Sequence, residues 1–244
     1  FHVETPWHEP SSLVAWERFA RRCAELISGL GPVAVTTLNE PNVLLLGGYL
    51  GAAMPPGLSD GKKGFAAMAN LVRAHVLARE ALRDRGVPAQ VGIAQNMLVF
   101  APARRWHPLD QALTRLADAN YDHAFPQALA TGTLELAMPG FTAGRAHIDG
   151  AAGSTDFTGI NYYSRAHLRF AAAPPWVHFE FRDVHRRGLT DIGWEWYPEG
   201  FGQLLRQVGR YGKPVWVTEN GLDDRTGARR ARYLHEHWQE LLRA

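Results

Sequence analysis

Two glutamates, Glu40 and Glu219, stand at the ends of apolar segments that are typical of β-strands, and each is flanked by an asparagine. Cleavage of a glycosidic bond requires two carboxyl groups across a cleft, because one protonates the leaving oxygen while the other attacks the sugar or activates water. A strand-end glutamate can equally be solvated or cap the next helix, and a carboxylate marks function only statistically. The spacing of the pair therefore suggests this chemistry and leaves the function open.

The elements that must position these carboxylates alternate along the chain as short apolar runs and longer amphipathic stretches, which predicts parallel βα units. Strands are expected at residues 33–38, 90–94, 157–162 and 214–218. Helices are expected from a cap at 11 or 12 to 30, then at 65–85, 109–130, 201–211 and 228–243, with long excursions at 42–64 and 164–197. No linker divides this pattern, so we expect one domain over residues 1–244.

Polar residues gather where three of these expected strands end, at positions 39–40, 161–163 and 219–221. Doubly wound sheets and (β/α)8 barrels both build their active sites at the carboxyl ends of parallel strands. The barrel is the better prediction because these residues come from widely separated strands and must converge. The runs 33–35 and 215–217 lack polar alternation, which predicts strands that are covered on both faces.

Composition narrows the classes of partner. The 244 residues carry a formal charge of +2, which gives no basic footprint for nucleic acid. The longest apolar run, at 43–56, is interrupted by glycines and is too short to span a bilayer. No secretion signal opens the chain, and its one cysteine permits no intrachain disulfide. These features favour a cytoplasmic location without membrane contact.

Several residues that invite a functional interpretation have a simpler one. The run 29–34 spells G-x-G-x-x-A, but it follows an expected helix and opens a strand, the reverse of a dinucleotide site. No metal-ligand spacing or G-x-S-x-G elbow occurs. We interpret His75 as a core histidine, Cys23 as buried and inert, and His235 and His237 as surface residues. We expect no metal and no cofactor.

The letters around the two glutamates carry more information than their spacing. Thr37-Leu38-Asn39-Glu40-Pro41 resembles the acid/base segment of family 1 glycoside hydrolases, the β-glucosidase family, and Val217-Thr218-Glu219-Asn220-Gly221 resembles its nucleophile segment. Between them, residues 159–163 (G-I-N-Y-Y) and 193–200 (G-W-E-W-Y-P-E-G) resemble two further segments of that family. Each match is weak by itself, but four matches in the family's order are specific.

This resemblance implies a retaining β-glycosidase with Glu40 as the general acid/base and Glu219 as the nucleophile. Asn39 would bind the sugar 2-hydroxyl, in a contact that strengthens in the transition state. Tyr163 would hold the nucleophile carboxylate through its phenol, and Asn161 would support the site from the same strand end. The substrate would be a β-linked glycoside or oligosaccharide.

Two further residues are weaker candidates. His2 lies four residues before Pro6, where the family's H-x-x-x-P places a sugar-binding histidine. Trp176 follows Tyr163 in the long excursion, and we expect it to contact the aglycone side of the substrate, because aromatic rings stack on the apolar faces of sugars.

The resemblance covers nearly the whole chain but only part of the family's barrel. By its motifs, the chain covers strands three to seven and lacks strands one, two and eight. We therefore expect an incomplete (β/α)8 barrel, since five strands cannot close one, and a further segment or partner chain that completes it.

Two alternatives to a simple β-glycosidase stay open. A 6-phospho-β-glycosidase would bind its phosphate near strand eight, outside this sequence. A non-catalytic carbohydrate-binding remnant of the same fold would keep its sugar affinity when either glutamate is replaced.

Overall fold

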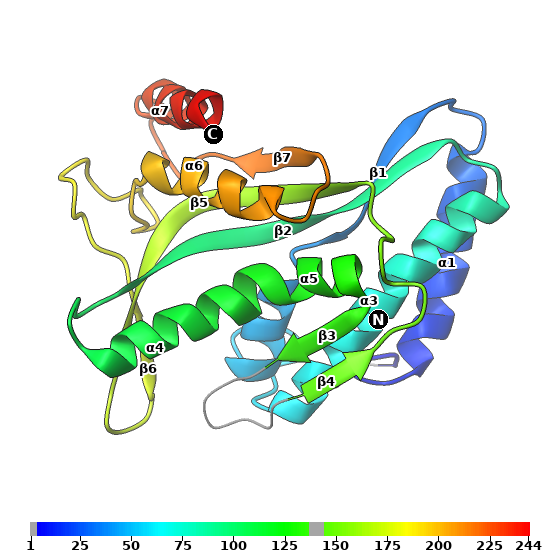
Figure 1. The fold of residues 1–244 in the computed structure, drawn as a ribbon, viewed down its shortest axis with the longest axis horizontal. Helices are drawn as coiled ribbons and strands as arrows, with labels where there is room; N and C mark the ends of the chain where they lie inside the picture. Colours follow the sequence, from blue (N-terminus) through cyan, green and yellow to red (C-terminus); the bar gives the residue numbers. More distant parts are fainter. Residues whose placement is uncertain (1–3, 137–143) are drawn as a thin grey trace. The chain divides into compact units, whose positions relative to one another are not determined.

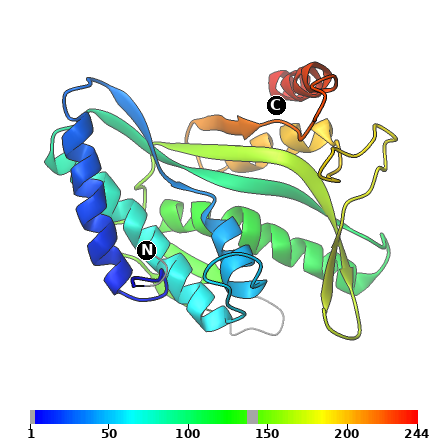
Figure 2. The ribbon, with the colours of Figure 1, turned by 180° about the vertical axis from the view of Figure 1, so that it is seen from behind.

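The computed structural model describes residues 4–136 and 144–244, which Figures 1 and 2 show from opposite sides. The chain divides into two compact units. The first unit comprises Phe1–Asn96 and His123–Gly159, and the second comprises Met97–Asp122 and Ile160–Ala244. The single domain expected over residues 1–244 stays a prediction.

The first unit begins with helix α1 and contains the strand that leads to Glu40. Its elements are α1 (Ser11–Ile27), β1 (Val33–Asn39), α2 (Pro41–Val43), the π-helix η1 (Leu44–Leu50), α3 (Gly61–Asp84), the start of β2 (Ala89–Pro102), α5 (Ala124–Thr131), β3 (Thr133–Leu136) and β4 (Gly144–His147). β1 and β2 are parallel, with Val33 opposite Ala89. α1 and α3 lie side by side in both views.

Buried polar side chains fix α3 within this unit. The Trp16 indole donates to the Ala74 carbonyl at 2.7 Å and thereby ties α1 to α3. His75 is fully buried, and its ring bonds the Thr37 hydroxyl of β1 at 2.7 Å and the Ser154 carbonyl at 3.1 Å. Burial lowers the pKa of His75 to about 4, so the ring is neutral near pH 7. The interpretation of His75 as a core histidine agrees with this geometry.

The second unit contains the strand that leads to Glu219. Its elements are the end of β2, α4 (Pro108–Ala117), most of the π-helix η2 (Asp118–His123), nearly all of β5 (Phe157–Phe170), β6 (Val177–Glu180), α6 (Pro198–Gly209), β7 (Val215–Asn220) and α7 (Arg230–Arg243). β5 lies between β2 and β6, and β7 also pairs with β5. β5 and β6 form an antiparallel hairpin.

An aromatic cluster holds α6 and α7 against β5 in this unit. The Tyr162 ring stacks on Phe201 with centroids 5.5 Å apart, and its hydroxyl donates to the Tyr197 carbonyl. Gly200 permits this approach, since a Cβ there would collide with the Tyr162 hydroxyl. On α7, the His237 ring stacks on Tyr233 at 3.9 Å and is fully buried. The expectation that His237 is a surface residue is therefore wrong, whereas His235 is exposed as expected.

The helix expected at 109–130 and the two expected excursions differ from the structure. The helix expected at 109–130 is interrupted by η2, where the Asn120 amide donates to the Leu116 carbonyl at 2.8 Å and the Asp122 carboxyl accepts from the Leu98 N–H at 3.0 Å. Such bonds compete with regular helix. The excursion expected from 42 contains α2 and η1, and the one expected from 164 begins with the last residues of β5 and the β6 strand.

The strands that lead to the two glutamates are less covered than their apolar sequences predict. Ala34 and Thr36 of β1 are exposed, and Trp216 and Val217 of β7 are 37% and 39% exposed. Among the described strands, β1 pairs with β2 alone and β7 with β5 alone, so each has one strand edge without such a partner. Cys23 is half-buried rather than buried, because it faces the space beside β1.

Candidate active site

Glu40 follows the last residue of β1 and precedes α2. Its backbone is left-handed, with φ 49° and ψ 54°, and its N–H donates to the Ala94 carbonyl of β2 at 2.8 Å. A side chain in this region costs about 1–3 kcal/mol and persists where the surroundings impose it. The turn lets the chain pass from strand to helix in one residue, which leaves the half-buried carboxyl at the strand end.

Asn96, near the end of the first unit's part of β2, orients the Glu40 carboxyl. The Asn96 amide donates to Glu40 Oε1 at 2.8 Å, and the Asn96 carbonyl accepts from the Asn42 amide at 2.7 Å. Asn42 and Asn96 are both buried, at 1% and 8% exposure. Asn39, the last residue of β1, is exposed beside Glu40 and opposite Ala94.

Glu219 lies on β7, and Tyr163 of β5 binds its carboxylate. The Tyr163 phenol donates a hydrogen bond to Glu219 Oε2. The Tyr163 ring lies 5.8 Å from that of Trp194, which in turn stacks on Phe181. Trp194 therefore limits where the phenol can point. Tyr163 and Glu219 are both half-buried.

The strand ends beneath this carboxylate are fixed by further side chains. The Tyr233 hydroxyl of α7 donates to the Tyr163 carbonyl at 2.9 Å. Burial raises the pKa of Tyr233, which keeps its phenol protonated as a donor. The Thr218 hydroxyl donates to Asn161 Oδ1 at 2.6 Å, and Asn161 is fully buried. The Asn220 amide donates to the Tyr162 carbonyl at 2.8 Å, so β5 and β7 are joined on both sides of Glu219.

The structure divides the expected site residues between the two units. Asn39 and Glu40 lie in the first unit, whereas Asn161, Tyr163 and Glu219 lie together in the second. Trp176 stands at the turn between β5 and β6, 53% exposed, with its carbonyl accepting from the Ala171 N–H at 3.0 Å. His2 lies outside the described residues.

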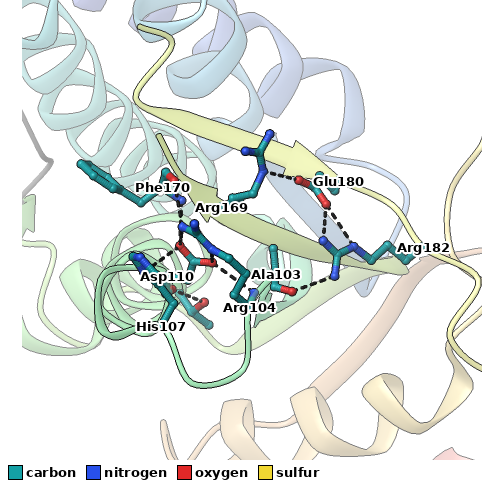
Figure 3. A network of polar contacts seen from close by, with 9 residues as sticks. Ala103, Arg104, His107, Asp110, Arg169, Phe170, Glu180 and Arg182 are labelled. Atoms are coloured by element: carbon teal, nitrogen blue, oxygen red, sulfur yellow. Dashed lines mark hydrogen bonds and ion pairs between the residues drawn. The ribbon is translucent and has the colours of Figure 1, made fainter. Parts of the chain in front are cut away.

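The β5–β6 hairpin that carries Trp176 is held by two clusters of charged residues (Figure 3). The Asp110 carboxyl is fully buried and accepts from the Arg104 guanidinium at 2.7 and 2.9 Å and from the Phe170 N–H at 2.9 Å. The Arg104 hydrogen bonds lower the pKa of Asp110, which stays ionised. These contacts tie the start of α4 to the end of β5.

The second cluster joins the two sides of the hairpin to the end of β2. Glu180 accepts from Arg169 Nε at 2.7 Å and from Arg182, while Arg182 Nη1 donates to the Ala103 carbonyl at 2.7 Å (Figure 3). The hydrogen bonds from Arg182 and Arg169 lower the pKa of Glu180. These contacts hold both strands of the hairpin, whereas Trp176 in its turn is exposed.

A buried ion pair lies two residues beyond Tyr163 on β5. Arg165 donates to Glu195 at 2.6 and 2.9 Å, and its guanidinium stacks 3.8 Å from the Tyr197 ring centroid. Burial alone would raise the pKa of Glu195, but hydrogen bonds from His167 and Arg165 lower it. This pair anchors the segment that contains Trp194 to β5.

Within residues 4–136 and 144–244, no group of three histidine, cysteine or acidic side chains is arranged to hold a metal ion. No helix in those ranges combines the length and apolar content that crossing a membrane requires.

The chain matches the model of glycosyl hydrolase family 1 over residues 4–244. The chain belongs to that family. Among curated relatives, a β-galactosidase of Pyrococcus woesei is 28% identical over 95% of this chain and 50% of its own length. A β-glucosidase A of Thermotoga maritima is 30% identical over 88% of this chain and 48% of its own length. This family 1 chain thus spans about half the length of the curated relatives it matches.

The fold agrees with this assignment. A β-glycosidase structure from Pyrococcus horikoshii matches with a TM-score of 0.83 and 29% identity, over 96% of this chain and 53% of that one. The predicted (β/α)8 barrel class is confirmed, and the barrel is partial in this family 1 chain.

Four residues of the site were not among those expected from the sequence. Asn96 holds Glu40, and Tyr233, Thr218 and Trp194 surround the Tyr163–Glu219 pair. The sequence could have indicated Asn96, because it is a polar residue just beyond an apolar strand, as Asn39 and Glu219 are. Tyr233 lies on a helix 70 residues from Tyr163 and carried none.

Proposed function

We propose that this family 1 chain supplies both carboxylates of a retaining β-glycosidase. The observation that carries the proposal is the phenol of Tyr163 donating to Glu219 at the end of a strand, in a family of glycosyl hydrolases. A phenol that donates to one carboxylate oxygen limits the rotation of that group and leaves the other oxygen to attack. Glu219 therefore has the local arrangement that a nucleophile needs to form a bond with the sugar.

The reaction proceeds in two displacements. The Glu219 carboxylate attacks the anomeric carbon, the bond to the glycosidic oxygen breaks, and Glu40 gives its proton to that oxygen. Water then attacks the same carbon, gives a proton to Glu40, and the ester bond to Glu219 breaks. The starting protonation of both glutamates is restored, and the anomeric configuration is retained.

The remaining site residues bind the sugar in this proposal. Asn39 contacts the 2-hydroxyl, Asn161 supports the sugar side of β5, His2 binds a sugar hydroxyl, and Trp176 contacts the aglycone. The substrates are β-glucosides or related β-glycosides. Because the matched relatives are about twice as long as this chain, we propose that a further segment or chain completes the barrel around these residues.

The test is release of 4-nitrophenol from 4-nitrophenyl β-glucoside by the purified chain, beside a Glu219→Ala variant of verified mass. Turnover that is lost in the variant supports the proposal, and product with β configuration in the first minutes supports retention. A folded chain that binds glucosides with equal affinity before and after Glu219→Ala, without turnover in either, would favour the carbohydrate-binding remnant. Turnover of 6-phospho-glucosides alone would favour the phospho-glycosidase.

A further inference from the structure

The carboxyl group of Asp122 is buried in the second unit with a single hydrogen-bond donor. Asp122 lies in the π-helix η2 and is 0% exposed, and its Oδ1 accepts from the Leu98 N–H of β2 at 3.0 Å. Within residues 4–136 and 144–244, its Oδ2 has no hydrogen-bond partner and no contact with solvent. A buried carboxylate normally has a cation or several donors, because an isolated charge is very costly to remove from water.

The other end of the same helical segment shows what a buried carboxylate requires. Helix α4 continues directly into η2. Near the start of α4, the equally buried Asp110 accepts from the Arg104 guanidinium and from the N–H groups of Arg104 and Phe170 (Figure 3). The segment is thus held at its start by an aspartate that is paired with a cation, and at its end by Asp122, to which the described residues supply no cation.

The titratable groups near Asp122 do not supply the missing compensation. Burial raises the pKa of Asp122 well above its usual range, and the charge of Asp118, which is half-buried on the same η2, raises it further. Tyr211, just beyond α6, is neutral near pH 7, because burial and the two carboxyls raise its pKa. Arg210 lowers the pKa of Asp118. His123, which follows Asp122, is itself buried.

We propose that Asp122 and the Leu98 N–H form an alkaline-sensitive latch, which holds η2 on β2 while Asp122 carries a proton and opens when that proton passes to solvent. A neutral carboxyl group stays in an apolar site at far lower cost than an anion. Once ionised, Oδ2 can be solvated only if η2 moves away from β2. Asp110 keeps its charge and its donors throughout, so the start of α4 stays in place and the opening is confined to η2.

The direction of the pH dependence follows from the tighter binding of a proton by Asp122 in the folded chain. An aspartate in the unfolded chain ionises with its ordinary pKa of 3.8. Above that pH, and until Asp122 ionises in the folded chain, unfolding releases one proton. The stability that this proton contributes is complete below pH 3.8 and falls as the pH rises, by about tenfold in the unfolding equilibrium constant per pH unit.

Urea unfolding of the chain and of Asp122→Asn, between pH 5 and 8, tests the latch. Asparagine keeps the size of the side chain and the oxygen that accepts from Leu98, but it does not ionise. Other groups titrate alike in the two proteins and cancel in the ratio of their unfolding equilibrium constants. This ratio, chain to variant, should rise about 100-fold between pH 5 and 7.

The matched control is another buried aspartate of the second unit. Asp224 accepts from the Arg229 N–H at 2.8 Å and from the Thr226 N–H and hydroxyl at 3.2 and 3.0 Å. Burial alone would raise the pKa of Asp224, but these hydrogen bonds lower it. Asp224 is therefore ionised in both the folded and the unfolded chain above pH 5. Asp224→Asn should lower stability by a factor that does not change between pH 5 and 8.

Two measurements on the folded chain keep the test independent of how the variants fold. In ¹³C NMR of the chain labelled at its aspartate carboxyls, one resonance should remain that of a carboxylic acid at pH 6. Hydrogen exchange, corrected for its ordinary acceleration by base, should show the Leu98 N–H losing protection as the pH rises. The Phe170 N–H, which donates to Asp110, should keep its protection over the same range.

Three results would overturn the latch. A ratio of chain to Asp122→Asn that stays constant from pH 5 to 8 would mean that Asp122 has the same charge in the folded and unfolded chains. Aspartate resonances that are all those of anions at pH 6 would mean the same. Equal loss of protection at Leu98 and Phe170 would mean that the whole unit unfolds and that η2 does not open by itself. None of these measurements requires turnover, so their outcome is independent of the proposed glycosidase activity.

Discussion

The two proposed catalytic carboxylates are held in different ways, each by residues of its own unit. The backbone of Glu40 is left-handed, and its carboxyl group accepts a hydrogen bond from the Asn96 amide at 2.8 Å. Glu219 accepts from the phenol of Tyr163, whose own carbonyl accepts from buried Tyr233. The first carboxyl is aimed chiefly by its backbone, and the second by a chain of donors that ends in an aromatic cluster.

The difference suits the two proposed roles. An amide donor to Oε1 tolerates both a carboxylate and a carboxylic acid whose proton is on Oε2, so it permits the proton exchange that an acid/base performs. A phenol on a ring that is itself packed and hydrogen-bonded limits the rotation of a nucleophile's carboxylate. The chain therefore positions Glu40 through its backbone turn and one amide, and Glu219 through a phenol that Tyr233 anchors, a contrast that substitutions can test.

The largest expected effect comes from replacing each glutamate. The two replacements should differ in how the loss of kcat depends on the leaving group of the substrate. Glu219→Ala should lower kcat by more than about 10³-fold for every aryl glucoside, because the attacking group is gone. Glu40→Ala should cost about 10²–10⁴-fold for a methyl glucoside, whose leaving oxygen needs a proton. The same variant should cost far less in the first step with 2,4-dinitrophenyl glucoside, whose leaving group departs as an anion.

The measurement is burst and steady-state kinetics with both substrates, in whichever assembly hydrolyses the aryl glucoside. Equal losses with both leaving groups in Glu40→Ala would contradict the assignment of Glu40 as the acid.

Ion pairs give the next largest contrast between the units. Glu195 is 1% exposed and pairs with Arg165, which is 12% exposed. Glu195→Gln leaves a buried guanidinium uncompensated and should lower the free energy of unfolding by about 3–5 kcal/mol. The Arg79–Asp156 pair of the first unit has side chains that are 35% and 33% exposed. Asp156→Asn should cost about 1–2 kcal/mol, since water replaces part of the lost interaction.

Urea unfolding of both variants, followed by tryptophan fluorescence, gives the two values. A cost in Asp156→Asn that equals that of Glu195→Gln would mean that the first unit depends on its ion pair as strongly as the second.

In each unit, one of the buried histidines has a lowered pKa and makes the comparison pH-dependent. Burial lowers the pKa of both His75 and His237 from 6.5 to about 4. Between these values the unfolded chain binds a proton that the folded chain does not. The stability that each neutral ring contributes is therefore complete above pH 6.5 and falls by about 1.4 kcal/mol per unit as the pH drops toward 4.

In a plot of unfolding free energy against pH, His75→Gln and His237→Gln should each reduce the slope between pH 4 and 6.5 by about 1.4 kcal/mol per pH unit. His235→Gln, at an exposed position of α7, is the matched control and should leave the slope unchanged. A slope that only one of the two buried variants reduces would place the acid sensitivity in a single unit.

Much of this arrangement could be predicted from local sequence. β1 and β7 begin within a residue of their expected starts, and β5 begins at Phe157 as expected. Glu40 and Glu219 lie at strand ends, as the apolar residues that precede each of them indicate. Alternation and turn residues are properties of a few adjacent positions, so a sequence records them directly.

The features that could not be predicted depend on residues far apart in the chain. His237 is buried because Tyr162 and Phe201 surround a face of α7 that carries few apolar residues. The exposure of Ala34 and Thr36 depends on which strands lie beside β1. The sequence of β1 does not indicate whether it has one neighbouring strand or two. The left-handed backbone of Glu40 belongs to the single-residue passage from β1 to α2, at a residue type that seldom adopts it.

The smallest expected effect concerns Tyr233 and Asn42, which do not contact the two carboxylates but hydrogen-bond the residues that donate to them. The Tyr233 hydroxyl donates to the Tyr163 carbonyl at 2.9 Å, and the Asn42 amide donates to the Asn96 carbonyl at 2.7 Å. Tyr233→Phe and Asn42→Ala each remove a hydrogen bond worth about 1 kcal/mol and loosen the donor to one glutamate. Each should therefore lower kcat by about 3- to 10-fold, with KM nearly unchanged, because the misaligned group acts in the transition state.

The leaving group again distinguishes the two variants. Tyr233→Phe loosens the nucleophile, so its loss should be the same with methyl and 2,4-dinitrophenyl glucosides. Asn42→Ala loosens the acid, so its loss should appear with the methyl glucoside and largely vanish with the dinitrophenyl one. Equal leaving-group dependence in the two variants would mean that the carboxylates are coupled, and that the units do not orient them independently.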